Sequence, residues 1–274
     1  MSPRFDFNSK AVLITGAGGG IGRALAIELA RRGARLALAD ISTDGLAATQ
    51  AALPAGSISH IYPIDVADEG AIKALPARIR GALDGLDVLI NNAGVAQGGV
   101  FEAVSESDFA RVIDINFWGV VRMTRAFLPM LREGHDARLV NLSSLYGLIS
   151  PPGQVAYSSS KFAVRGFSNA LAQELVGSSV GVTVVHPGGV RTEIATAARA
   201  PQGMPADEVA KQKAANGRLL RLSPERAAWI IADGIERRKR RVLVGSDAKF
   251  VAVLERLLPT AHMGILMRKY RKGT

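Results

Sequence analysis

The 274-residue sequence contains no cysteine, which excludes disulfide bridges, thiolate catalysis and cysteine-based metal sites. Its four histidines, His60, His135, His186 and His262, lack metal-ligand spacing. Each is predicted to be structural or exposed, and no metal site is expected. Aromatic residues make up only 5% of the chain, whereas aliphatic residues and 29 glycines are abundant. This composition suits a layered α/β protein whose helices approach a sheet closely.

Long hydrophobic runs are also missing. No segment reaches the roughly 18 apolar residues that a membrane span needs, and the N-terminus lacks the apolar core of a signal peptide. We therefore expect a soluble, cytoplasmic protein. With 48% hydrophobic residues and neither a repeat nor a linker, residues 1–274 are predicted to form one domain. The net charge is +10, and its excess lies near the C-terminus.

Residues 138–161 combine a predicted buried strand, a loop rich in proline and glycine, and the start of a helix. Ser144 ends the strand, and Tyr157 and Lys161 lie four residues apart on one helix face. Ser144 can meet them, because ligands bind at the carboxyl ends of the strands in open α/β sheets. A hydroxyl, a phenol and an ammonium brought together there indicate proton transfer to or from an oxygen.

The expected chemistry depends on the pKa of the Tyr157 phenol. An ordinary phenol has a pKa near 10, and lowering it by about three units takes roughly 4 kcal/mol of differential interaction. We expect Lys161 to lower the pKa, so that Tyr157 protonates a forming alkoxide or deprotonates an alcohol. The alternative is a half-buried tyrosine at a helix start beside a solvated lysine.

A glycine-rich loop follows the first predicted strand, residues 10–15. Gly16, Gly20 and Gly22 precede a strong helix-forming segment that Gly33 ends. Bare backbone permits close approach and helix-N-terminal amides face an anion, so the loop is predicted to cradle phosphate. A glycine turn without a ligand is the alternative. The spacing Gly-x-x-x-Gly-x-Gly differs from the usual dinucleotide fingerprint.

Two aspartates end the next predicted strands, residues 35–40 and 59–66. Asp40 follows Gly22 by 18 residues, where an acid hydrogen-bonds a ribose 2′-hydroxyl and repels a 2′-phosphate. It predicts NAD over NADP, although Arg23 could soften this preference and Asp40 could instead begin a turn. Asp65 either accepts from an adenine amino group or caps the following turn.

The remaining segments complete an alternating pattern of strands and helices. Ser107 is predicted to cap a helix that reaches about residue 131 and carries Asn116 at its centre. Asparagine is a mediocre helix residue, so Asn116 is either exposed or part of a site. Residues 193–223 are predicted to form a substrate lid with a short helix at 205–216, and residues 246–274 a partly helical C-terminal extension.

In their order, these motifs resemble the short-chain dehydrogenase/reductase family over about residues 8–245. Thr15-Gly16-x-x-x-Gly20-x-Gly22 is that family's own form of the glycine loop. Further matching positions are Asp65-Val66, Asn91 to Gly94, Asn116, Ser144, Tyr157, Lys161 and Pro187-Gly188. The resemblance implies a Rossmann-type, doubly wound parallel sheet of about seven strands.

The same resemblance implies an oxidoreductase that transfers a hydride between NAD(H) and a secondary alcohol or ketone. It implies that Tyr157 is the general acid/base, that Lys161 lowers its pKa and binds the nicotinamide ribose, and that Ser144 orients the substrate oxygen. Asn116 would hold a water in a proton relay. The implied cofactor-binding residues are Gly16, Gly20, Ile21, Gly22, Asp40, Asp65, Val66, Asn92, Ala93, Gly94, Tyr157, Lys161, Pro187, Gly188, Val190 and Thr192.

Beyond residue 193 the resemblance weakens, so it does not identify the substrate. An apolar substrate body is expected, and six apolar residues either line its pocket or pack in the core or lid: Leu145, Leu148, Ile149, Val155, Ile194 and Met204. A second hypothesis is a non-catalytic NAD(H)-sensing protein that docks to an acidic partner or a membrane surface through its basic tail.

The expected partners follow from surface patterns. Apolar faces on the predicted helices at 107–131 and 157–175, together with the resemblance, predict a homodimer or homotetramer. Nucleic acid is not expected, since no aromatic residues are interleaved with the cations at 237–241. The apolar and basic segments at 250–258 and 264–272 are predicted to cover the substrate cleft or pack on another subunit, with an anionic membrane surface as the alternative.

Overall fold

The computed structural model describes residues 4–194, 197–200, 205, 207, 210, 217 and 220–271. Its centre is a parallel sheet of seven strands in the order β3-β2-β1-β4-β5-β6-β7. The strands are β1 (Ala11–Thr15), β2 (Arg35–Asp40), β3 (Ser59–Pro63), β4 (Val88–Asn91), β5 (Ala137–Leu142), β6 (Val180–Pro187) and β7 (Arg241–Val244). The chain order reverses between β1 and β4, which places the ligand crevice at their carboxyl ends. The predicted doubly wound sheet is confirmed.

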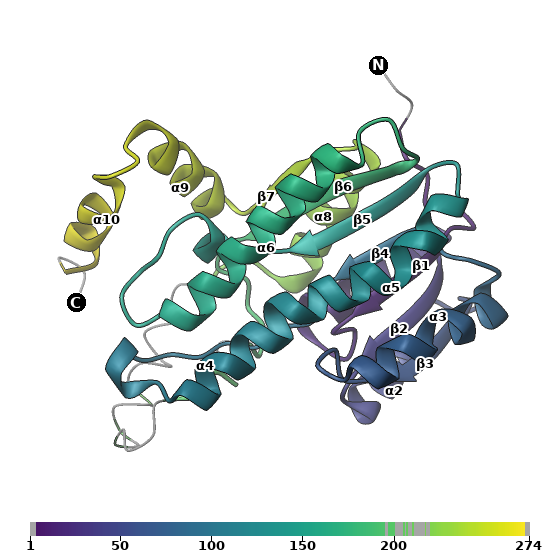
Figure 1. Ribbon diagram of the computed structural model, residues 1–274, viewed down its shortest axis with the longest axis horizontal. Helices are drawn as coiled ribbons and strands as arrows, with labels where there is room; N and C mark the ends of the chain where they lie inside the picture. The colour runs from purple at the N-terminus through teal and green to yellow at the C-terminus, as the bar shows by residue number, and fades with distance from the viewer. Residues whose placement is uncertain are drawn as a thin grey trace.

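Helices cover both faces of the sheet (Figure 1). One face carries α1 (Gly20–Arg31), α2 (Thr43–Ala51) and α8 (Pro224–Glu236). The other carries α3 (Glu69–Leu83), α5 (Gly119–Glu133) and α6 (Val155–Glu174). The helix α4 (Glu106–Ile113) precedes α5, and α9 (Ser246–Leu257) and α10 (His262–Arg271) follow β7. Short 3-10 turns lie at Phe101–Ala103 and Leu145–Gly147.

The strand β1 shows how the sequence builds these layers. Val12 and Ile14 pack in the apolar cluster that contains α1 and α8, whereas Ala11 and Leu13 pack in the cluster that contains α3 and α5. Successive side chains of a strand point to opposite faces, and an internal parallel strand is buried on both. Each fully buried aliphatic side chain stabilises the fold by about 1.5–3 kcal/mol.

The start of α4 corrects a prediction. Ser105, not Ser107, caps the helix: its Oγ accepts a hydrogen bond from the N–H of Asp108 at 3.1 Å, and its backbone is extended. The Ser105 hydroxyl also donates to the Asp108 carboxylate at 2.9 Å. Ser107 already lies in the first turn. The Ser-x-x-Asp pattern from Ser105 to Asp108 supplies the capping hydroxyl and a carboxylate that accepts a hydrogen bond from the same hydroxyl.

The predicted continuous helix at 107–131 is also interrupted. Residues Asp114–Trp118 form a π-helical turn between α4 and α5. Such a turn contains one extra residue and is frequent at functional sites. Asn116 lies at its centre and is fully buried, so it does not occupy an exposed position of an ordinary helix.

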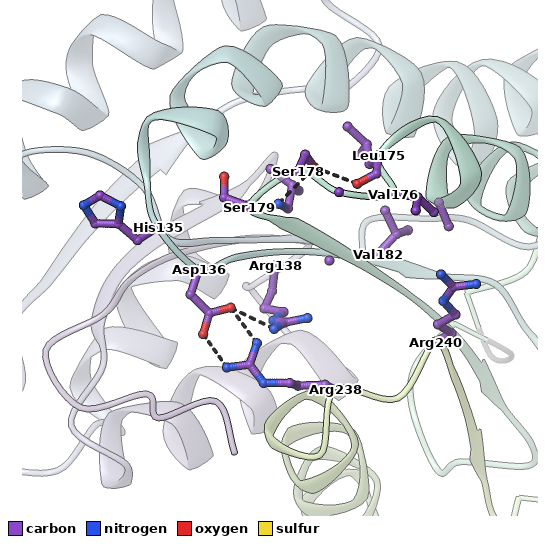
Figure 2. Close-up of a pocket in the computed structure, with 14 residues that line it drawn as sticks. His135, Asp136, Arg138, Leu175, Val176, Ser178, Ser179, Val182, Arg238 and Arg240 are labelled. Carbon is purple, nitrogen blue, oxygen red and sulfur yellow. Dashed lines mark hydrogen bonds and ion pairs between the residues drawn. The ribbon is translucent and has the colours of Figure 1, made fainter. Parts of the chain in front are cut away.

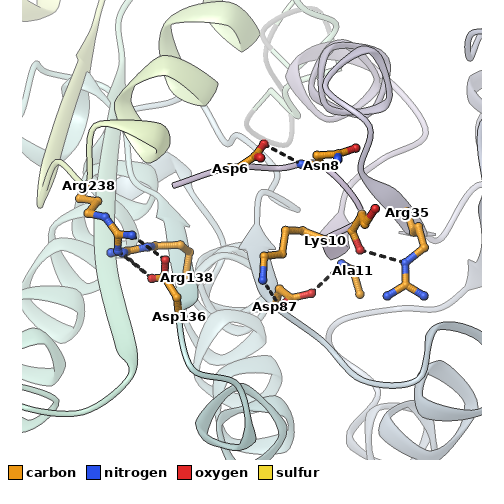
Figure 3. Close-up of polar contacts among 10 residues, drawn as sticks. Asp6, Asn8, Lys10, Ala11, Arg35, Asp87, Asp136, Arg138 and Arg238 are labelled. Atoms are coloured by element: carbon orange, nitrogen blue, oxygen red, sulfur yellow. Dashed lines mark hydrogen bonds and ion pairs between the residues drawn. The ribbon is translucent and has the colours of Figure 1, made fainter. Parts of the chain in front are cut away.

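The amino ends of the strands are tied together by ion pairs (Figure 3). Asp136 accepts two hydrogen bonds from Arg238, at 2.7 and 2.6 Å, and one from Arg138 at 2.8 Å. Lys10 donates to Asp87 at 3.0 Å. A pocket of about 550 Å³ beside Arg138 and Arg238 (Figure 2) contains none of the predicted site residues. This edge therefore holds strand ends together, and the candidate site lies at the opposite edge.

The chain after β7 forms a pair of helices at the side of the body, where α9 and α10 extend away from the sheet (Figure 1). Within the residues that the structure describes, every helix is too short or too polar to span a lipid bilayer. The predicted short helix at 205–216 and Met204 lie outside the described residues, apart from isolated positions of that segment.

Candidate functional site

A cleft of about 1590 Å³ opens along the carboxyl ends of the strands. It exceeds the 300–1,000 Å³ typical of pockets for one small molecule, so it has room for a cofactor and a substrate together. All the predicted site residues line this cleft except Gly22 and Asn116, which lie behind its wall.

The glycine loop forms one end of the cleft. Gly16 and Gly20 have φ angles of +66° and +51°, which favour glycine. A Cβ at Gly22 would lie 1.9 Å from the Gly16 carbonyl oxygen, and one at Gly18 would lie 2.9 Å from the Asp40 carboxyl carbon. The residue before α1 is Gly19, which has no capping side chain, so the first amides of α1 remain for an anion. The loop fits the diphosphate of a dinucleotide.

Asp40 lies against this loop at the end of β2. Its Oδ2 accepts from the N–H of Gly18 at 2.8 Å, and its Oδ1 accepts from the N–H of Ser42 at 2.9 Å. Arg23 lies at the same wall, where it donates to the Gly18 carbonyl and, at 3.0 Å, to the hydroxyl of Thr49. The structure thus places an acid and a cation together at the wall of the cleft beside the glycine loop.

Asp65 caps the turn after β3 by accepting from the N–H of Ala67 at 2.9 Å. It also lines the cleft together with Val66, so both alternatives predicted for Asp65 remain compatible with its position. Val66 packs against Gly119, where an added Cβ would lie 2.9 Å from its Cγ2. This close approach fixes the cleft wall to the first turn of α5.

Asn92 joins the ends of β1 and β4. Its side-chain amide donates to the carbonyls of Thr15 and Gly16, both at 3.0 Å. The Thr15 hydroxyl in turn accepts from the backbone N–H groups of Asn92 and Ala93, at 3.0 and 3.1 Å. Asn92 therefore positions the glycine loop, a role that sequence reasoning did not assign to it. Thr15 shares that role, and its place directly before the loop was the available signal.

The side-chain amide of Asn116 is hydrogen-bonded to protein groups through both its oxygen and its nitrogen. Its Oδ1 accepts from the N–H of Val95 at 2.8 Å, and its Nδ2 donates to the Val95 carbonyl at 2.9 Å and the Ser160 hydroxyl at 3.0 Å. The Ser160 hydroxyl donates in turn to the backbone carbonyl of Tyr157 at 2.7 Å. Through these contacts the π-helical turn links the exit of β4 to the start of α6.

Ser144, Tyr157 and Lys161 meet at the centre of the cleft, where β5 ends and α6 begins. The Ser144 hydroxyl accepts a hydrogen bond from the backbone N–H of Tyr146 at 3.1 Å, and it lies close enough to the Tyr157 phenol to lower the pKa of that phenol. The Lys161 ammonium lies 5.6 Å from the centroid of the Tyr157 ring and donates to the Leu142 carbonyl at 3.1 Å. Ser143, by contrast, turns away and donates to the backbone carbonyl of Lys161 at 2.8 Å.

The pKa values at this centre differ from the expectation. Burial raises the pKa of the Tyr157 phenol above its usual value, and the nearby Ser144 hydroxyl lowers it in part. Burial also lowers the pKa of Lys161 to about 8. Removal from water disfavours both the phenolate and the ammonium. The Tyr157 phenol is consequently neutral near pH 7 in this structure.

His186 supports the same centre from β6. It is fully buried, and its Nδ1 lies 2.9 Å from the backbone carbonyl of Ser144. Because a carbonyl only accepts, Nδ1 is the donor in this hydrogen bond. Burial lowers the pKa of His186 to about 4, so the ring is neutral near pH 7. The prediction of a structural histidine fits this position, but its contact with Ser144 was not foreseen.

The turn after β6 closes the cleft opposite the glycine loop. Thr192 faces Gly20, where an added Cβ would lie 3.2 Å from the threonine side chain. Asp247, in the first turn of α9, accepts from the N–H of Gly189 at 2.7 Å. The C-terminal extension thereby fixes the Pro187-Gly188-Gly189 turn, a contact that the sequence alone did not indicate.

The far end of the cleft is apolar. Of the six predicted pocket residues, Leu145, Ile149 and Ile194 line it. Leu148 is instead buried in a small cluster with Val251, and Val155 is 42% exposed and lies outside the cleft. Further lining side chains come from α9 and α10, namely Phe250, Val251, Met263, Leu266 and Met267. The extension therefore covers this end of the cleft.

Comparisons with known proteins agree with this geometry. A family model described as short chain dehydrogenase matches residues 10–203. The putative oxidoreductase SadH of Mycobacterium tuberculosis (strain ATCC 25618 / H37Rv) is 42% identical over 264 residues, which cover 95% of each protein. Nodulation protein G of Rhizobium sp. (strain N33) is 36% identical over 185 residues, which cover 67% of this chain and 74% of that protein.

Solved structures show the same likeness. A short chain dehydrogenase/reductase from Burkholderia phymatum in complex with NAD has a TM-score of 0.84 and 30% identity, covering 92% of this chain and 94% of that one. A short-chain dehydrogenase from Streptomyces avermitilis has a TM-score of 0.80 and 31% identity, covering 97% and 98%. The resemblance read from the motifs is confirmed, and the chain belongs to the short-chain dehydrogenase family.

Proposed function

We propose that this protein interconverts a secondary alcohol and its ketone with NAD(H), using Tyr157 to deliver and remove the proton. The observation that carries the proposal is the meeting of Ser144, Tyr157 and Lys161 at the centre of the cleft. These groups converge from a strand end and a helix start, so they are held before any substrate binds.

In the reductive direction Tyr157 acts as a general acid. Its phenol is neutral because burial raises its pKa, so it has a proton to give to the carbonyl oxygen of a ketone. The Ser144 hydroxyl holds the same oxygen and stabilises the charge that develops on it. The bound nicotinamide supplies the hydride. In the oxidative direction the phenol first releases its proton to solvent, and the phenolate so formed removes the alcohol proton.

The other site residues would hold the cofactor. The amides at the start of α1 face the diphosphate, Asp40 accepts from the adenosine ribose, and Lys161 donates to the nicotinamide ribose. Asp40 supports a preference for NAD(H), and it agrees with the NAD named in the Burkholderia phymatum structure. Arg23, on the same wall, reduces but does not cancel the repulsion of a 2′-phosphate.

The substrate is proposed to have an apolar body. Leu145 and Ile149 line the cleft from one side, and the α9–α10 extension adds Met263 and Met267 from the other. Methionine adapts its shape to irregular apolar ligands, which favours a bulky hydrocarbon group over a small polar alcohol.

Self-association is proposed through α5 and α6. Trp118 and Phe162 are 47% and 37% exposed on this side of the molecule. Phe117 contacts both Trp118 and Phe167, with ring centroids 5.5 and 6.3 Å apart, which extends the apolar surface between the helices. Aromatic side chains gathered on one face are typical of a subunit interface.

The test is a scan of purified protein against secondary alcohols and ketones of increasing apolar size, followed by NADH absorbance. Turnover that increases with apolar size, and falls at least a thousandfold in Tyr157→Phe with NADH binding retained, is expected. If Tyr157→Phe turns over like the wild type, Tyr157 is not the acid. If NADH binds tightly but no substrate reacts, the NAD(H)-sensing alternative replaces this proposal.

A further inference from the structure

We propose that the outer face of α9 binds the surface of an anionic lipid bilayer. Phe250, Val253 and Leu257 lie three and four residues apart, so they line one side of the helix. They are 55%, 59% and 72% exposed, whereas Val251 and Ala252 on the inner side are buried. We call Phe250, Val253 and Leu257 the outer stripe. The helix α9 thus has an apolar face toward the body and a second one toward solvent.

The charge around the outer stripe selects an anionic partner. Residues 246–274, from the start of α9 onward, contain six basic and two acidic residues, a net charge of +4. Lys249 and Arg256 are exposed on α9 and follow from helical geometry as neighbours of Val253 at the edge of the stripe. Apolar side chains bordered by cations are the pattern of helices that lie in the interface of an anionic membrane.

A second copy of this chain is a poorer occupant for the same face. Two-fold contacts bring the same patch of both subunits together, so they would gather Lys249 and Arg256 of both copies in one contact. Like charges across such a contact oppose association.

Bilayer binding would also bring the apolar end of the cleft close to substrates dissolved in the membrane. This consequence rests on the proposed function, whereas the binding itself does not. The inner sides of α9 and α10 line the apolar end of the cleft through Val251, Met263 and Met267, and Phe250, at the edge of the outer stripe, borders the same end. An interfacial helix enters about 5–10 Å into the headgroup and acyl boundary. The apolar end of the cleft would then lie beside the acyl chains, where a membrane-dissolved alcohol or ketone is concentrated.

The test is sedimentation of the full-length protein with vesicles of phosphatidylcholine alone or with about 30% phosphatidylglycerol. We expect pelleting only with the anionic vesicles, and release as salt rises, since screening weakens the attraction. Val253→Ser/Leu257→Ser should weaken binding at least tenfold. Lys249→Gln/Arg256→Gln should weaken it about fivefold per residue at low salt and flatten the salt dependence.

Val100→Ser/Phe101→Ser is the matched control, because these residues are 62% and 66% exposed away from α9. It should pellet like the wild type. Wild-type protein that stays in the supernatant with anionic vesicles overturns the proposal, as does equal loss in the control pair. A change of oligomer mass in Val253→Ser/Leu257→Ser, measured by light scattering, would assign the stripe to another subunit instead. Alcohol dehydrogenase activity plays no part in these readouts, so failure of the proposed function leaves them interpretable.

Discussion

The carboxylate of Asp40 is hydrogen-bonded to the backbone N–H of Gly18 at 2.8 Å, so the acid at the end of β2 and the glycine loop after β1 form one rigid unit. The second carboxylate oxygen is held by Ser42. Asp40 cannot swing away from a 2′-phosphate without breaking both contacts. The NAD(H) preference that we propose for this cleft therefore depends on the backbone of two neighbouring strand ends.

Asp40→Asn should shift the preference toward NADPH. The amide oxygen can still accept from Gly18, while the negative charge is lost and Arg23 remains on the same wall. We expect the ratio of kcat/KM for NADPH to that for NADH to rise about tenfold, which corresponds to about 1.4 kcal/mol. Asp44→Asn, which removes an exposed acid from α2, is the control and should leave the ratio unchanged. An unchanged ratio in Asp40→Asn would mean that the acid does not face the ribose.

Lys161→Met should stabilise the fold while abolishing activity. Burial lowers the folded-state pKa of Lys161 from 10.5 to about 8, so the folded state binds this proton less tightly than the unfolded state. The resulting cost is fully present below pH 8 and disappears as pH rises through 10.5. Removing the amine should raise the free energy of unfolding at pH 7 by about 1–3 kcal/mol, after allowance for the lost hydrogen bond to Leu142.

Denaturant unfolding of both proteins at pH 7 and pH 10 measures this. The advantage of Lys161→Met should shrink to below about 1 kcal/mol at pH 10, because the wild-type lysine is then neutral in the folded state. An advantage that is equal at the two pH values would show that packing, not the buried charge, causes it.

Asp136→Asn should destabilise the amino edge of the sheet. Asp136 is the partner of both Arg138, whose side chain is 9% exposed, and Arg238. Removing the carboxylate leaves the Arg138 guanidinium buried without its counter-ion, which should cost about 1–3 kcal/mol. The control is Glu133→Gln, whose partner Arg80 is about half exposed, and it should give no measurable change in denaturant midpoint. Equal effects would indicate that both pairs are solvent-screened.

Phe162→Glu should dissociate the oligomer proposed for the α5–α6 face. The side chain is 37% exposed next to the aromatic cluster, and a carboxylate placed in a dry contact is costly to desolvate. Light scattering should show a reduced mass for this variant. Phe101→Glu, which places the same charge on a 66% exposed phenylalanine elsewhere, should keep the wild-type mass. A strictly monomeric wild type would disprove the interface.

Sequence reasoning could locate the cleft because its residues stand at strand ends. In a parallel sheet all carboxyl ends share one edge, so Gly16, Asp40, Asn92, Ser144 and Thr192 had to gather there once the strands were identified. The loop geometry at Gly16 and Gly20 followed from the glycines themselves.

The parts that could not be predicted depend on contacts between distant segments. The raised pKa of Tyr157 comes from burial, which no local pattern reports. The hydrogen bond between His186 and the Ser144 backbone joins β6 to the end of β5. The cap at Ser105 is a different case, because its Ser-x-x-Asp pattern is present in the sequence and predicts the cap better than Ser107 does.

The π-helical turn at Asp114–Trp118 changes the direction in which the following side chains point around the helix axis. One extra residue rotates everything that follows by about 100° relative to a continuous α-helix. The chain can thereby make contacts in two directions. Asn116 is directed to Val95 and Ser160, and Met123 and Phe127 of α5 are directed to the sheet. Length is therefore more tightly constrained here than residue identity. Loss of a single residue between 114 and 118 would restore an ordinary helix and turn one of these faces away from its partner.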